Sequence, residues 1–199
     1  MKKIRNFNLR LHFKEIRQRA KRKFDLNKIG LDDDGLSRLI DDVEKRLKPA
    51  VIYESFGPEA EDTAKLAPVP GLAHTLGIAT LGPDLLPYVI ETREASEQRG
   101  LLLEFIAASA LRQAVNFIIS LLKDDLEAER CELSPIEYLD SPEQSAAVHA
   151  KLDGGKILVE LKDGALRPEH SAAFCVSWLA KRRGGAKKRP KASSGGRRV

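Results

Sequence analysis

The spacing of hydrophobic and polar residues predicts a chain that mixes helices with strands. The strongest pattern covers residues 101–128, where apolar residues recur at helical spacing over a wide face of one long helix. Such a face needs cover from other elements on most sides, so we expect this helix to be central. A second helix is predicted after a cap at Asp33 or Asp34, and its apolar positions are Leu36, Leu39, Ile40, Val43 and Leu47.

Other segments have the spacing or composition of strands. Alternating apolar residues predict a short strand over residues 7–13, and the spacing then changes to a basic helix that reaches Phe24. Clustered β-branched and aromatic residues predict a strand at Ala50–Phe56, and a further strand is predicted over residues 74–80. Three prolines between residues 57 and 71 indicate a loop.

The part of the chain from Arg130 to Trp178 combines a bend with short elements. A corner at Ser134-Pro135 precedes a helical stretch, a strand over residues 156–161 and a turn at Asp163-Gly164. Pro168 and Ser171 then open a last strand over residues 172–179. Because the strands are few and irregularly spaced, with no βαβ cadence, the fold class is predicted to be α+β.

Composition and charge divide the chain into a body and a tail. A chain of 199 residues fits one domain, predicted at 1–180, with a disordered basic tail at 181–199. Ten basic residues and one acid lie in residues 1–24, and nine basic residues lie in the tail, whereas residues 25–180 hold 15 basic against 28 acidic residues. An acidic body is therefore expected between two basic ends.

Localisation is predicted from what the sequence lacks. We find no run of about 18 apolar residues and no apolar signal region, so neither a membrane span nor secretion is expected. The two cysteines lack metal-ligand spacing, and reduced thiols in a cytoplasmic protein are the favoured interpretation over a structural bridge. The four histidines are scattered, and no metal site is predicted.

Four segments occur in an order that resembles the activation domain of cobalamin-dependent methionine synthase. They are IATLGPDLLPYV (78–89), the long helix, SPIEYLDSPEQ (134–144) and KILVELKDGALRPEHSAAF (156–174), so that the resemblance runs from about residue 36 to 174. It implies a twisted, mainly antiparallel sheet with a long central helix and flanking helices. It also implies an S-adenosylmethionine site that includes Ser134, Pro135, Tyr138, Pro168 and Ser171. The Ser134-Pro135 bend is expected to line a cleft floored by the last two strands.

The chain departs from the family at the ligand corner. Glu132, Ile136 and Glu137 stand where the family has arginine, glycine and tyrosine. An arginine can pair with a ligand carboxylate, whereas a glutamate repels it. S-adenosylmethionine binding is therefore expected to be weakened or lost.

The resemblance implies an accessory role rather than catalysis by this chain. Family members present the ligand to oxidised cobalamin on another domain while a reduced flavoprotein supplies the electron. The Asp-x-His-x-x-Gly cobalamin loop is missing here. A divergent, stand-alone member is therefore expected to assist a corrinoid methyltransferase in trans, with cobalamin held only on that partner.

Two other interpretations remain open. One is a non-enzymatic interaction module that keeps the same fold and uses the basic N-terminal helix and the tail to hold an anionic partner, either an acidic protein or nucleic acid. Alternatively the tail is only solvated, and Ser134-Pro135 is an ordinary turn.

Overall fold

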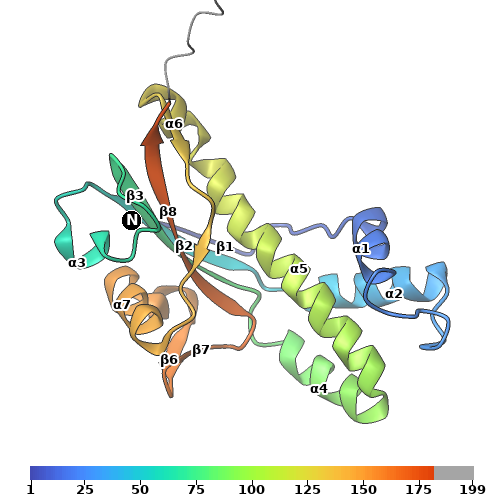
Figure 1. Ribbon diagram of the computed structural model, residues 1–199. Coiled ribbons are helices and arrows are strands. Elements are labelled where there is room, and N and C mark those ends of the chain that lie inside the picture. The colour runs from blue at the N-terminus through green and yellow to red at the C-terminus, as the bar shows by residue number, and fades with distance from the viewer. Residues whose placement is uncertain (182–199) are drawn as a thin grey trace, which may run out of the picture.

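The computed structural model describes residues 1–181 of this α+β protein. A sheet and a long central helix dominate the fold, with shorter helices around them (Figure 1). The helices are α1 (Phe13–Ala20), α2 (Asp33–Glu44), α3 (Glu61–Ala64), α4 (Leu85–Ala95), α5 (Glu97–Leu121), α6 (Lys123–Ala128), α7 (Pro142–Leu152) and the 3-10 helix η1 (Gly154–Ile157). The strands are β1 (Lys2–Arg5), β2 (Ala50–Phe56), β3 (Ala73–Thr80), β4 (Cys131–Leu133), β5 (Glu137–Tyr138), β6 (Glu160–Lys162), β7 (Ala165–Arg167) and β8 (Ser171–Ala180).

The main sheet is antiparallel throughout. Its strands follow the order β1-β2-β3-β8-β4, and β5 also pairs with β8, while β6 and β7 form a separate hairpin. The central strands β3 and β8 pair over eight positions, from Ala73 opposite Trp178 to Thr80 opposite Ser171. The last strand therefore lies in the middle of the sheet, beside a strand that precedes it by about ninety residues.

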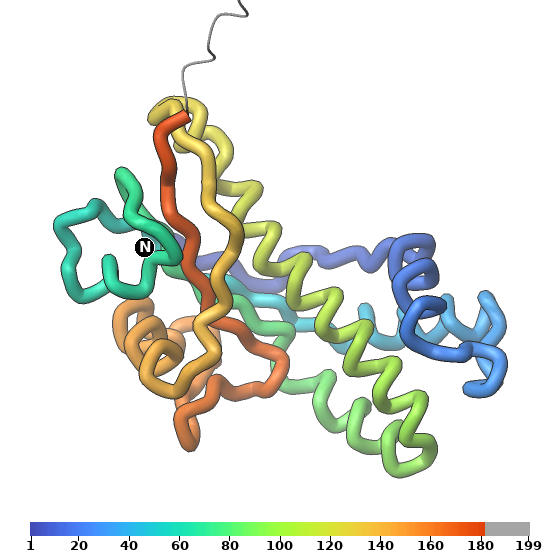
Figure 2. Tube along the Cα trace, viewed as in Figure 1, coloured from blue at the N-terminus to red at the C-terminus, as the bar shows by residue number. Residues whose placement is uncertain are grey.

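One face of the sheet is covered by the long helix. In α5, Leu103, Ile106 and Ala110 are fully buried, and they belong to one core cluster with Val51 and Phe174 of the sheet. The helices α1, α2 and α4 pack around α5, which crosses the sheet diagonally in Figure 2. We call this side of the sheet the α5 face.

The opposite side, the α7 face, is covered by α7, η1 and the β6–β7 hairpin. Val148 and Leu152 of α7 pack with Ile52 and Ile78 of the sheet in a second core cluster. Successive residues of a strand point to opposite faces, so each central strand contributes to both clusters. The centre of the sheet is thus covered on both sides, and β3 is buried at every position after Ala73.

By length and composition alone, α5 could cross a membrane. Its most apolar 18-residue window has a mean hydropathy of 1.4, and half of that window is buried inside the protein. The core helix of a folded domain has the same character, and the packing of α5 against the sheet accounts for its apolar face.

The structure confirms the α+β class, the antiparallel sheet and the central helix, and it corrects several details. The strand expected over residues 7–13 is wrong, because this segment is irregular and β1 lies earlier, at Lys2–Arg5. In the strand expected over residues 156–161, the first two residues belong to η1 and only the last two belong to the short β6. The cap of α2 is Asp32, whose carboxylate accepts a bond from the Gly35 amide at 2.7 Å. The predicted tail lies outside the described residues apart from Lys181.

Candidate functional site

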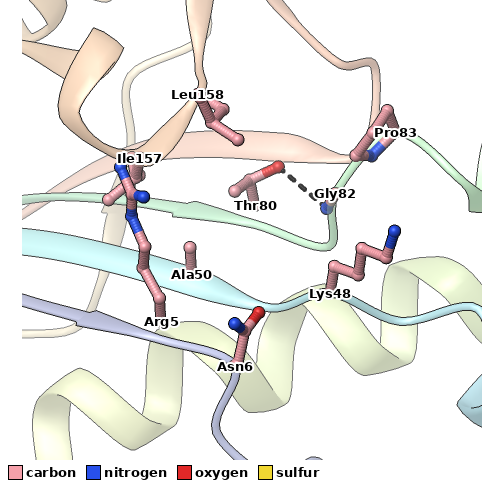
Figure 3. A pocket seen from close by; sticks show the side chains of 9 residues that line it. All are labelled: Arg5, Asn6, Lys48, Ala50, Thr80, Gly82, Pro83, Ile157 and Leu158. Atoms are coloured by element: carbon pink, nitrogen blue, oxygen red, sulfur yellow. Dashed lines mark hydrogen bonds between the residues drawn. The ribbon is translucent and has the colours of Figure 1, made fainter.

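A pocket opens at the end of the main sheet where β1 ends and β2 begins. Its volume is about 550 Å³, within the range of about 300–1,000 Å³ usual for small-molecule sites. Figure 3 shows its lining side chains, which come from β1, the start of β2, the end of β3 and η1. They belong to Arg5, Asn6, Lys48, Ala50, Thr80, Gly82, Pro83, Ile157 and Leu158. We call it the sheet-end pocket.

The TLGP motif forms one wall of this pocket. Thr80 is 2% exposed, and its hydroxyl accepts a hydrogen bond from the Gly82 amide at 3.2 Å. Gly82 has a φ of 85°, and a β-carbon there would lie 2.8 Å from the Lys48 β-carbon, so the turn requires glycine. The motif therefore acts as a tight corner that leads β3 into α4.

A hydroxyl pair joins this corner to the start of β8. Ser171 lies directly opposite Thr80 in the sheet, and its hydroxyl donates to the Thr80 hydroxyl oxygen at 2.8 Å. The Leu81 amide also donates to the His170 carbonyl at 2.9 Å. Two segments that the sequence analysis singled out, TLGP and Pro168–Ser171, are thus adjacent in space.

His170 links the same region to the long helix. Its Nε2 lies 3.1 Å from a carboxylate oxygen of Glu104, which also contacts Arg93 at 3.4 Å. The His170 side chain is 9% exposed, and its Nδ1 is the one buried side-chain nitrogen or oxygen without a hydrogen bond in residues 1–181. This link fixes α5 against the segment before β8.

Two cations border the sheet-end pocket. The Arg5 guanidinium donates to the Lys156 carbonyl, and the Lys48 ammonium pairs with Asp84 at 2.7 Å. The sequence analysis did not single out Arg5, Asn6, Lys48 or Leu158. No local motif distinguishes them, because strand pairing and the η1 turn bring them together.

The Ser134-Pro135 bend lies elsewhere along β8. The Ser134 amide donates to the Ser177 carbonyl, and the Ser134 hydroxyl accepts from the Ser177 amide, both at 2.9 Å. Ser177 is six residues from Ser171, which corresponds to about 20 Å along a strand. The Ser134 hydroxyl is therefore engaged in holding the edge segment to β8.

The expectation of one shared cleft is wrong for these residues. Tyr138 is 37% exposed and pairs with Phe174, which faces α5, whereas Ser171 is on the α7 face of the same strand. A pocket of about 200 Å³ does include Ser171, and the edge segment reaches it only at Leu139 and Asp140. That volume is below the range of about 300–1,000 Å³ that is usual for small-molecule sites, so the pocket is too small for S-adenosylmethionine.

The three residues that depart from the family corner have structural surroundings of their own. Ile136 packs against the core cluster on the α5 face, so its side chain occupies space that a glycine would leave empty. Glu132 and Glu137 are exposed on the edge strands β4 and β5. The Ser134-Pro135 corner is therefore flanked by two carboxylates, and position 132 does not supply the guanidinium that the family has there.

The cysteines and histidines form no reactive cluster within the described part of the chain. Cys131 and Cys175 are both buried and form no disulfide, and burial raises the pKa of the Cys175 thiol to about 12. This thiol is therefore protonated at neutral pH and a poor nucleophile. Across residues 1–181, no three His, Cys, Asp or Glu side chains are placed to hold a metal ion.

Comparison with known proteins assigns no family to the chain. No family model matches the sequence, and no curated protein matches it significantly.

Proposed function

We propose that this chain is a divergent relative of the methionine synthase activation domain that docks on a cobalamin-binding methyltransferase and assists its reductive reactivation in trans. The observation that carries the proposal is the contact between TLGP and Pro168–Ser171. The resemblance rests on the order of these segments, and a common site requires that they meet. The hydroxyl bond between Ser171 and Thr80 at 2.8 Å brings them together.

The docking surface in this proposal is the end of the sheet around these segments. Pro168 lies between Arg167 and Glu169, which form an exposed ion pair at 2.9 Å. Beneath this surface, the bond between the buried Thr80 hydroxyl and the partly buried Ser171 hydroxyl holds the backbone in place. Strand ends that buried hydrogen bonds hold in place form a rigid platform, which suits docking on a folded partner.

S-adenosylmethionine has little part in this proposal. The carboxylate of such a ligand would meet Glu132 in place of an arginine. The Ser134 hydroxyl is already bonded to β8, and Tyr138 is on the face opposite to Ser171. In this proposal the chain docks on the partner and positions it, and it performs no catalytic step. Cobalamin is bound by the partner alone.

Calorimetric titration against a cobalamin-loaded methionine synthase from which the activation domain has been removed tests the proposal. We expect a saturable one-to-one complex. Glu169→Arg removes the ion pair with Arg167 and reverses a charge beside Pro168, and it is expected to weaken binding at least about tenfold, or ~1.4 kcal/mol. Glu59→Arg makes the same change in an exposed loop at the opposite end of the sheet and is the matched control.

Equal affinities for the two variants would rule out the sheet end as the docking surface. Absence of heat with the unaltered chain, at concentrations of tens of micromolar or above, would reject docking itself.

A second function, binding of an anionic partner by the basic N-terminal region, is favoured by a groove against α5. The groove has a volume of about 470 Å³, and Arg10, Arg19 and Arg112 contribute to its walls together with several amide side chains. Its one acid, Glu15, lies 3.4 Å from Arg19. Arginines that converge from a loop and two helices suit phosphate groups.

Under this alternative, the affinity for a single-stranded oligonucleotide should fall steeply as salt rises and should be lost in Arg112→Glu. Fluorescence anisotropy at two salt concentrations measures both effects. An affinity that is unchanged by Arg112→Glu would exclude the groove.

A further inference from the structure

Residues with positive φ gather around the sheet-end pocket. Eight residues in the described chain have positive φ, and three of them, Asn6 at 54°, Leu158 at 61° and Gly82 at 85°, line this one pocket. Positive φ is unfavourable for residues with a β-carbon, and most of all for bulky ones. Strain of this kind gathers at ligand sites, where the surrounding structure holds it in place.

The left-handed conformation of Leu158 ends η1, and its amide donates to the Gly155 carbonyl at 3.0 Å, but its side chain gains no burial in the core. Its neighbours Ile157 and Val159 are 2% and 0% exposed and anchor the chain in the core on the α7 face. Between them, the left-handed conformation turns Leu158 outward, so that it is 71% exposed. Glycine or asparagine would adopt this conformation more easily. A large apolar side chain that is both strained and exposed over a pocket is explained by contact with a ligand.

The polar lining indicates the charge of that ligand. Arg5 and Lys48 lie on opposite sides of the pocket in Figure 3, and no carboxylate is among the lining residues. A guanidinium has five N–H donors and an ammonium three, so the bonds to the Lys156 carbonyl and to Asp84 leave donors on both cations. The side-chain amide of Asn6, which has no hydrogen bond in the described chain, adds a further donor.

The apolar lining indicates the remainder of the ligand. Leu158 and Ile157 lie above the pocket in Figure 3, Ala50 lies below, and Pro83 closes one end. An anion without an apolar part would leave Leu158 in water.

We propose that the sheet-end pocket binds a small amphiphilic anion, with a carboxylate, sulfonate or phosphate group held by Arg5 and Lys48 and an apolar body packed against Leu158. The site is complete within this chain. It does not depend on docking to another protein, and it can be tested on the full chain alone.

Two naphthalene probes separate the contributions of charge and apolar contact. Anilinonaphthalene sulfonate carries both features, whereas N-phenyl-1-naphthylamine has the same aromatic body without the sulfonate. In fluorescence titrations we expect one saturable site for the sulfonate and at least about tenfold weaker binding of the neutral probe. Arg5→Gln should weaken the sulfonate about tenfold and leave the neutral probe unchanged, because only the charged contact is lost.

A glycine substitution separates ligand contact from stability. Leu158→Gly should keep or raise the melting temperature, since glycine tolerates positive φ, while it weakens both probes at least about fivefold. Asp163→Gly is the matched control: Asp163 also has a positive φ, 53°, but it is in the β6–β7 turn outside the pocket. This control should leave probe binding unchanged.

Several results would overturn the proposal. They are the absence of saturable sulfonate binding, equal affinities for the two probes, or a Leu158→Gly chain that binds both as tightly as the unaltered chain. If Leu158→Gly instead lowers the melting temperature, the argument from strain is wrong. The Arg5→Gln titration then decides whether the anion site itself stands.

Discussion

Replacement of Ile106 by aspartate is expected to unfold the protein. Ile106 is 0% exposed in the middle of α5 and belongs to the core cluster between this helix and the sheet. The substitution removes a buried side chain worth about 1.5–3 kcal/mol and places a carboxylate in its position at a cost of several kcal/mol more. The total approaches the ~5–15 kcal/mol that stabilise a typical domain. Circular dichroism and thermal melting measure the effect.

Leu101→Asp is the matched control for this prediction. Leu101 is in the same helix but is 45% exposed, so a carboxylate there remains in water. The expected cost is within about 1 kcal/mol. An Ile106→Asp protein that melted at the same temperature as Leu101→Asp would show that α5 is not the centre of the core.

Gly77→Ala is expected to destabilise the sheet by about 1–3 kcal/mol, or more if the core cannot adjust. Gly77 lies opposite Phe174 in the β3–β8 pair, and a β-carbon there would lie 2.4 Å from the Phe174 ring. Phe174 is 0% exposed, so its ring has no free space to enter. Urea denaturation measures the loss as a lower midpoint with an unchanged slope.

A double substitution identifies the cause of that loss. Phe174→Leu removes the ring atoms that the new methyl group would meet, so adding Gly77→Ala to it should cost less than adding it to the unaltered chain. At Gly155 the nearest atom to an added β-carbon is 3.5 Å away, and Gly155→Ala should be nearly neutral. If Gly77→Ala lowered the free energy of unfolding equally in the unaltered chain and in Phe174→Leu, a clash with the Phe174 ring would not be the cause of the loss.

The elements that could be predicted are those whose signal is local. The β-branched and aromatic cluster predicted β2 with its observed bounds, and the helical pattern over residues 101–128 covers most of α5 together with α6. The strand predicted over residues 7–13 is wrong, because the apolar residues of this segment pack on α5 without strand pairing. The Phe7 ring stacks on the Phe117 ring of α5, with 4.3 Å between the ring centroids, while the segment itself is irregular. Residues Lys2–Arg5 form a strand because they pair with β2, which lies about fifty residues later in the chain. Such pairing produces no hydrophobic pattern within residues 2–5 from which the strand could be predicted.

The candidate site shows the same limit. TLGP and Pro168–Ser171 were recognised as motifs, but their contact depends on the register that sets Thr80 opposite Ser171. The resemblance to the activation domain implied that the Ser134-Pro135 bend shares this cleft, whereas the antiparallel pairing with β8 carries it about 20 Å away. Leu158 was assigned to a strand, and the left-handed turn that exposes it follows from the buried residues on either side.

In the proposed function, the folded body, rather than the basic tail, holds the corrinoid partner. The direct measurement is the dissociation constant for the cobalamin-loaded methyltransferase, determined with the full chain and with a chain that ends at Lys181, at about 50 mM and 200 mM salt. We predict affinities that agree within about threefold between the two chains and that fall less than about tenfold with salt. Loss of binding on removal of residues 182–199, or a steep decline with salt, would contradict the claim.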